Sequence, residues 1–106
     1  MATRTTKPDL GNLPLIPPGE ILAEEFLKPL GVGQNELARR LGIRPGRVSE
    51  IVNGRRSLTP DTAVRLSVFF GTSVEFWLNL QAQHDARVAR RDLRPAIEKI
   101  VRPHAA

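Results

Sequence analysis

Two short amphipathic segments joined at a glycine constrain the fold more than any other feature of the sequence. Each segment carries apolar residues at helical spacing, which places them on one face of a helix. These residues are Leu37, Ala38 and Leu41 in residues 33–42, and Val48, Ile51 and Val52 in residues 45–52. Gly42 ends the first segment and can adopt the positive φ of a tight turn. Two short helices joined in this way form a helix-turn-helix.

The rest of the chain also predicts helices. Runs of alternating β-branched and aromatic residues, which would indicate strands, are nearly absent, and the chain has no Tyr. Prolines and capping residues mark three further helix starts, at Pro18, Thr59 and Ser73. The last of these helices continues weakly through Val88, and Pro95 prevents it from going much further. With one or two helical turns in residues 96–101, the sequence predicts an all-α fold built on five helices.

The first helix has distinct apolar and acidic sides. It is expected to begin at Pro18 and to end near Lys28, because the residue before Pro29 is pushed out of helical geometry. Its apolar face comprises Ile21, Leu22, Phe26 and Leu30. Its solvent-facing side carries the densest acidic patch of the chain, which consists of Glu20, Glu24 and Glu25.

The length of 106 residues fits one small domain with terminal segments. Residues 1–16 predict an irregular N-terminal arm, residues 17–85 the helix-turn-helix domain, and residues 86–106 a basic, partly helical C-terminal extension. The net charge is +5, but it is unevenly distributed, because residues 39–65 hold seven arginines against two acidic residues. A basic block therefore coincides with the helix-turn-helix. The basic extension either adds nonspecific affinity for DNA or serves another purpose.

The composition excludes several classes of site. The chain has no Cys, which excludes disulfides, thiolate metal sites and thiol catalysis. His84 and His104 have no paired acids at ligand spacing, and neither a Ser-His-Asp arrangement nor a glycine-rich phosphate loop is present. We therefore expect no metal, no cofactor and no enzymatic activity. No apolar stretch has the length of a signal peptide or a membrane span, so a cytoplasmic location without membrane partners is expected.

The helix-turn-helix predicts binding to double-stranded DNA, because its second helix lies in the major groove while the first crosses the phosphate backbone. The side of the second helix opposite its apolar face is left to water or DNA. That side carries Arg44, Arg47, Ser49 and Glu50, with Arg55 and Arg56 just beyond the helix end. Arg44 and Arg47 are best placed to read bases, because guanidinium forks pair bidentately with guanine. The alternative is a helical protein in which this face is merely solvated.

Glu50 allows two interpretations. Its carboxylate could accept a hydrogen bond from cytosine or repel misplaced phosphates. It could also be a solvated acid that forms a weak pair with Arg47, one turn away on the helix. Gly46 contributes no side chain to readout, so few residues of this helix are left to read sequence.

Several segments of the chain resemble the HigA family of antitoxins, within the lambda-repressor-like helix-turn-helix class. The resemblance covers about residues 17–85 without gaps. The segments that carry it are Pro-Gly-Glu-Ile-Leu at 18–22, Glu-Phe-Leu-Lys-Pro-Leu-Gly at 25–31, Glu-Ile-Val-Asn-Gly-Arg-Arg at 50–56 and Phe-Trp-Leu-Asn-Leu-Gln at 76–81. The last segment is far more specific than a bare helix-turn-helix. One departure is Gly33, which stands where the family commonly has a capping Ser or Thr.

This resemblance implies a homodimer with two activities. One is repression of its own operon through a palindromic operator, and the other is neutralisation of a HigB toxin, an RNase of the RelE-like class that cleaves mRNA on the ribosome. Gln34 matches a family position that touches a phosphate or orients a base-reading side chain. Asn53, Arg55 and Arg56 match positions that contact the DNA backbone. The alternatives are a free-standing repressor of this class without a toxin, and a protein-interaction module that no longer binds DNA.

Two protein-binding surfaces are also expected. RelE-like toxins are basic, so the acidic patch of Glu20, Glu24 and Glu25, or the N-terminal arm, is expected to touch the toxin. Solvated charge on an exposed helix explains the same three residues. A dimer ridge is expected late in the last helix, where Trp77, Leu80, His84 and Val88 recur at intervals of three and four residues. Core packing is an alternative role for Trp77, and His84 could be a packed or surface histidine.

Overall fold

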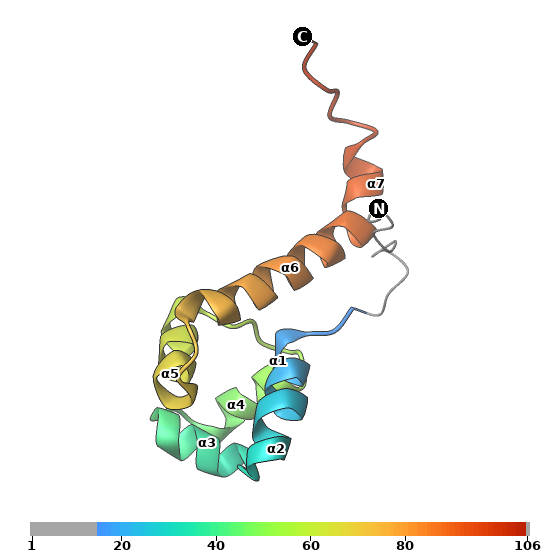
Figure 1. Ribbon diagram of the computed structural model, residues 1–106. Helices are drawn as coiled ribbons and strands as arrows, with labels where there is room; N and C mark the ends of the chain where they lie inside the picture. Colours follow the sequence, from blue (N-terminus) through green and yellow to red (C-terminus); the bar gives the residue numbers. More distant parts are fainter. Residues whose placement is uncertain (1–14, 106) are drawn as a thin grey trace, which may run out of the picture.

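The computed structural model describes residues 15–105, which are helical with no strand in that range (Figure 1). The elements are α1 (Pro18–Ile21), the π-helix η3 (Leu22–Leu27), α2 (Lys28–Leu30), α3 (Gln34–Leu41), α4 (Pro45–Val52), α5 (Pro60–Phe70), α6 (Val74–Asp92) and α7 (Arg94–Ile97). The first three are continuous and together form the first helix. With this helix counted once, the five expected helices are confirmed, and the short helix expected in residues 96–101 forms earlier, as α7 at Arg94–Ile97. The expected N-terminal arm lies almost entirely outside the described residues.

The first helix ends two residues later than the sequence predicted. It runs through Pro29 to Leu30 and stops at Gly31, whose φ is 68°. The N–H of Lys28 bonds the carbonyl of Ala23, five residues back, as in a π turn. In an α-helix the ring of Pro29 would meet the carbonyl four residues earlier. The wider π turn changes this geometry, so the helix continues past the proline.

The π turn also corrects the expected apolar face. Residues five apart share a face in such a turn, and Leu22 and Leu27 are only 1% and 5% exposed. Leu30, which was expected to face the core, is 61% exposed. The predicted face assumed a regular α-helical period, which the π turn interrupts.

All five aromatic side chains of the chain gather in one cluster that joins the first helix to α5 and α6. Phe26 has its ring centroid 4.9 Å from that of Phe70 and 4.8 Å from that of Trp77. Phe69 and Phe76 extend the cluster at 4.8 and 4.9 Å from their neighbours. Such pairs stabilise a core beyond the apolar area they bury.

Trp77 belongs to this core and is not available as a ridge residue. Its side chain is fully buried, and its Nε1–H donates to Oγ1 of Thr72 at 2.7 Å. The expectation that Trp77 contributes to a dimer surface is therefore wrong for this residue. Its size and its hydrogen-bonded N–H explain why it lies inside.

Helix α6 extends beyond the helical bundle and carries the C-terminal residues away from it (Figure 1). Its N-cap is Ser73, whose Oγ accepts from the N–H of Phe76 at 3.0 Å. The helix continues to Asp92, past the weak continuation expected to Val88. The expected boundary between residues 85 and 86 therefore lies inside α6. Pro95 falls in the first turn of α7, where a proline is tolerated.

No helix within residues 15–105 has the length and apolarity needed to cross a membrane. No group of three or more His, Cys, Asp or Glu side chains in that range could hold a metal ion.

Candidate nucleic-acid interface

The helix-turn-helix forms as the sequence predicted. Helix α3 ends at Gly42, whose φ of 74° makes the tight turn before α4. The N–H of Ile43 bonds the carbonyl of Ala38 at 3.0 Å and closes this turn. The buried residues that hold the two helices together are Leu37, Ala38, Leu41, Val48 and Ile51. The opposite side of α4 faces away from the core.

Three of the expected DNA-binding residues are exposed and unpaired on this side of the molecule. Gln34 opens α3, Arg44 is the N-cap of α4, and Arg55 follows the end of α4. No hydrogen bond or ion pair within residues 15–105 holds any of these side chains. Neither Gly33, the N-cap of α3, nor Arg44 caps its helix with a side chain. The first amide groups of both helices therefore have no side-chain acceptor.

Ser49 and Asn53 are brought together at the end of α4. Nδ2 of Asn53 donates to the carbonyl oxygen of Ser49 at 2.9 Å and to its Oγ at 3.3 Å. Asn53 is exposed and Ser49 is half-buried. The side chain of Asn53 is thus held against the last turn of α4.

Glu50 pairs with Arg56, and not with Arg47 as one interpretation of the sequence had it. Nε of Arg56 lies 2.8 Å from Oε1 of Glu50, since the chain after α4 turns back toward the helix. The hydrogen bond and the charge of Arg56 hold the pKa of Glu50 below its ordinary value of 4.5, with smaller effects from Arg44 and Arg55. The carboxylate is therefore ionised at neutral pH and surrounded by arginines.

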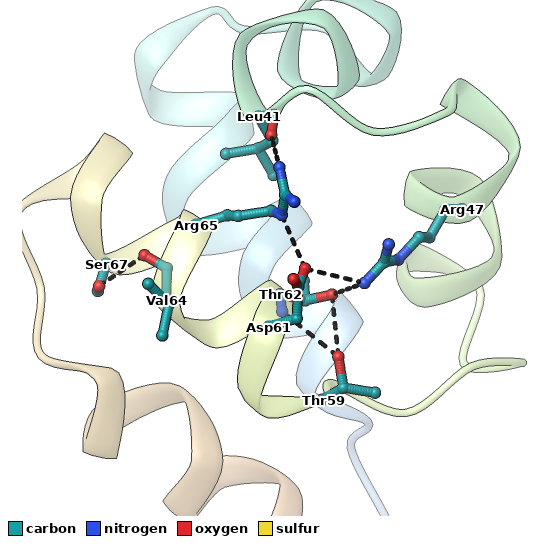
Figure 2. Close-up of polar contacts among 8 residues, drawn as sticks. All are labelled: Leu41, Arg47, Thr59, Asp61, Thr62, Val64, Arg65 and Ser67. Atoms are coloured by element: carbon teal, nitrogen blue, oxygen red, sulfur yellow. Dashed lines mark hydrogen bonds and ion pairs between the residues drawn. The ribbon is translucent and has the colours of Figure 1, made fainter.

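The side chain of Arg47 does not face solvent, as a base-reading side chain was expected to do. Its guanidinium turns toward the start of α5, where Nη2 lies 2.6 Å from Oγ1 of Thr62 and 3.4 Å from Oδ1 of Asp61 (Figure 2). The side chain is only 25% exposed. Its partners lie 14 and 15 residues further along the chain, so helical periodicity alone does not reveal them.

Sequence reasoning missed Arg65, which joins α5 to the turn of the helix-turn-helix. Its Nη1 donates to the carbonyl of Leu41 at 2.7 Å, and its Nε donates to Oδ1 of Asp61 at 2.7 Å (Figure 2). Asp61 and Arg65 are four residues apart, a spacing that could have indicated their ion pair. The contact with Leu41 had no comparable signal in the sequence.

An open groove of about 590 Å³ lies beside the start of α4 and concentrates positive charge. Four arginines line it, together with Gly42, Ile43 and Pro45. These arginines are Arg44, Arg47, Arg56 and Arg65. Although Arg47, Arg56 and Arg65 pair with Asp61 and Glu50, arginines outnumber carboxylates here. This excess favours an anionic partner, and arginine forks match the geometry of phosphate as well as of carboxylate.

Comparison with known proteins identifies the family. A helix-turn-helix family model matches residues 24–77. The structure of an addiction module antidote protein of the HigA family from Coxiella burnetii is 49% identical and gives a TM-score of 0.81. That match covers 87% of this chain and 100% of the Coxiella chain. The chain belongs to the HigA family of helix-turn-helix proteins.

Two further proteins are similar to this chain. The Pseudomonas aeruginosa antitoxin HigA, solved with the higBA promoter, is 36% identical with a TM-score of 0.84, and the match covers 87% of this chain and 100% of that one. Virulence-associated protein I from Dichelobacter nodosus is 46% identical over 81 residues, which are 76% of this chain and 75% of that protein.

The candidate partner surfaces of this HigA-family chain lie on the first helix and on α6. Glu20, Glu24 and Glu25 are all exposed on the first helix, as expected. Glu24 is paired with Lys28 at 2.9 Å, whereas the other two form no ion pair within residues 15–105. Of the expected ridge, Leu80, His84 and Val88 are half-buried on α6. Nδ1 of His84 lies 3.6 Å from Oδ1 of Asp85.

Proposed function

We propose that this chain is an antitoxin that represses its own operon by sequence-specific DNA binding and neutralises a HigB-type, mRNA-cleaving toxin by direct binding. The observation that carries the proposal is the exposed face of α4 beside a groove lined by four arginines, in a chain 36% identical to an antitoxin solved with its promoter. The protein acts by binding, without catalysis, in the cytoplasm and without a cofactor.

The DNA-binding residues divide into two groups. Arg44 reads base edges from the start of α4, with Ser49 and Glu50 further along the helix restricting which bases it meets. Gln34, Asn53, Arg55 and Arg56 contact the phosphate backbone and fix the register of α4 in the major groove. Arg56 also pairs with Glu50. This pairing reduces the repulsion between the Glu50 carboxylate and the DNA phosphates.

A homodimer places two copies of α4 on one operator. Leu80, His84 and Val88 supply the contact between the two copies along α6. A two-fold dimer demands half-sites that are also related by two-fold symmetry, with centres about 10–10.5 base pairs apart or a multiple of that distance. The palindromic operator follows from this symmetry.

The acidic patch of Glu20, Glu24 and Glu25 supplies the toxin contact. A toxin that binds RNA carries a basic surface, and exposed carboxylates on the first helix complement it. None of the three carboxylates lines the arginine groove, so toxin and operator contact different side chains.

Two measurements test the proposal. Fluorescence anisotropy should show that the protein binds the DNA upstream of its gene more tightly than a scrambled duplex of equal length. Equal affinity for the two duplexes would show that the chain does not recognise a specific DNA sequence, and this part of the proposal would fail. Expression of the neighbouring gene alone should arrest growth, and co-expression with this chain should restore it. Operator binding without any toxic neighbour would instead indicate a free-standing repressor.

A further inference from the structure

We propose that Thr62 and Asp61, at the start of α5, determine operator specificity by fixing Arg47, so that Arg47 is a positioning residue for α4 and not a reader of bases. This inference rests on the proposed DNA binding and deepens it. It names two residues outside the helix-turn-helix that set how well the recognition helix discriminates between sequences.

A short hydrogen bond to Thr62 holds the guanidinium of Arg47. Nη2 of Arg47 and Oγ1 of Thr62 are 2.6 Å apart, and Thr62 is only 1% exposed. Nε of Arg47 is shielded from solvent and has no hydrogen-bond partner among residues 15–105. A guanidinium committed to a buried partner in this way is not presented to a base edge. Removing its acceptor would leave a partly buried charge short of a hydrogen bond.

Thr62 is itself held in place, so it acts as a rigid acceptor. Thr59 is the N-cap of α5, and its Oγ1 lies 3.3 Å from both the N–H and the Oγ1 of Thr62. Thr59 therefore holds Thr62 in place, and Thr62 in turn holds Arg47. Because Thr62 is buried, its hydroxyl does not contact DNA directly, and its hydrogen bond with Arg47 is the link from this hydroxyl to α4.

Asp61 links this contact to the other helix of the helix-turn-helix. Its Oδ1 lies 3.4 Å from Nη2 of Arg47 and 2.7 Å from Nε of Arg65. The Nη1 of Arg65 then binds the carbonyl of Leu41 at the end of α3. The first turn of α5 thus contacts both helices, through one arginine each (Figure 2).

The position of α4 that Arg47 fixes affects discrimination between DNA sequences more than it affects nonspecific affinity for DNA. Base readout requires hydrogen bonds within narrow limits of distance and angle, and a recognition site tolerates displacements of only about 0.5 Å. Exposed arginines such as Arg55 can follow a phosphate when the helix tilts, because their contact with the backbone carries no sequence information. A small rotation of α4 therefore weakens binding to the operator and leaves binding to random DNA nearly unchanged.

The test compares three variants by fluorescence anisotropy on the upstream duplex and on a scrambled duplex. Thr62→Val keeps the shape and removes the acceptor, Thr62→Ser keeps the acceptor, and Ser67→Ala is the matched control. Ser67 also lies on α5, but its Oγ bonds only the carbonyl of Val64 on the same helix, at 2.7 Å. We expect Thr62→Val to lose about tenfold in affinity for the upstream duplex and less than about twofold for the scrambled one. The other two variants should stay within about twofold on both.

The outcomes separate this inference from the proposed function. If the unaltered protein does not distinguish the two duplexes, both fail. If it does, and Thr62→Val distinguishes them equally well, this inference alone is overturned. Thermal unfolding followed by circular dichroism accompanies each variant.

A second measurement decides the role of Arg47 even where Thr62→Val does not fold. Selection of bound duplexes from a randomised pool gives the base preference at every operator position for the unaltered protein and for Arg47→Ala. A positioning role predicts that preferences weaken together across the half-site read by α4. Relaxation confined to one base pair would show that Arg47 reads that base, and would overturn the inference.

Discussion

Gly19 lies directly against the backbone of Ile51, so that the start of the first helix touches the last turns of α4. A Cβ on Gly19 would overlap the carbonyl oxygen of Ile51 and would lie 2.8 Å from Cα of Val52. Both partners are backbone atoms, which cannot rotate away as a side chain does. The first helix therefore supports the last turns of α4.

Gly19→Ala should destabilise the protein by about 1–3 kcal/mol, because the added methyl group displaces either the first helix or α4. Thermal unfolding followed by circular dichroism measures the loss. Gly46→Ala is the control, since a Cβ there meets nothing within 4 Å, and it should stabilise α4 by up to about 1 kcal/mol through helix propensity. An unchanged melting temperature for Gly19→Ala would contradict the close contact.

Arg44→Ala and Arg55→Ala should weaken DNA binding in different ways. Loss of Arg44 should cost about 1–3 kcal/mol on the operator and relax the preference at one base pair. Loss of Arg55 should weaken binding to all sequences and reduce the salt slope by about one. Salt titrations on operator and scrambled duplexes distinguish the two effects. Identical behaviour of the two variants would argue against the division between base and phosphate contacts.

The ion pairs beside the groove should make stability depend on pH in the acid range. The hydrogen bond from Arg65 lowers the pKa of Asp61 below 3.8, and that from Arg56 lowers the pKa of Glu50 below 4.5. A carboxyl whose pKa is lower in the folded state stabilises the fold above its ordinary pKa, and this contribution disappears as pH falls through the lowered value. The melting temperature should therefore fall as pH drops below about 4.5.

Asp61→Asn should reduce this acid dependence, because the amide does not titrate. Glu25→Gln is the control, since Glu25 is exposed and forms no ion pair within residues 15–105. Both carboxyls beside the groove are exposed, so added salt should weaken the effect. A melting temperature that responds to acid equally in Asp61→Asn and in the unaltered protein would exclude Asp61 as a contributor.

Replacing Glu20, Glu24 and Glu25 together by Ala should weaken binding to the toxin by at least about tenfold and leave operator binding unchanged. Isothermal titration with the purified neighbouring gene product measures the first effect, and anisotropy on the upstream duplex measures the second. Toxin binding as tight as that of the unaltered protein would show that the patch is only a solvated helix face.

The helices of the helix-turn-helix were predictable because local signals mark their ends. Gly33 and Gly42 flank α3 as its caps, and Pro45 begins α4, so sequence and structure agree there to the residue. The environment of Leu30 was predicted wrongly, and Leu27 lies in the core without having been expected there, since a π turn has no clear local signature.

The placement of Arg47 required tertiary structure. The sequence indicated that it lies on α4 away from Val48 and Ile51, which is correct, but a long side chain can reach from there to a neighbouring helix. Its partner Thr62 looks like an ordinary residue in the first turn of α5. Contacts between helices depend on how they pack, and periodicity within one helix contains no information about that packing.

The aromatic cluster gives the chain an intrinsic fluorescence signal that reports on its core. Trp77 is the single tryptophan of a chain without tyrosine, and it is fully enclosed by the core. Indole emission therefore comes from one site, which senses separation of the first helix from α6 through Phe26. Titration with DNA at α4 should leave this emission nearly constant, whereas unfolding should shift it to longer wavelengths. One spectrum thus distinguishes a variant that has lost its DNA contacts from one that has lost its core.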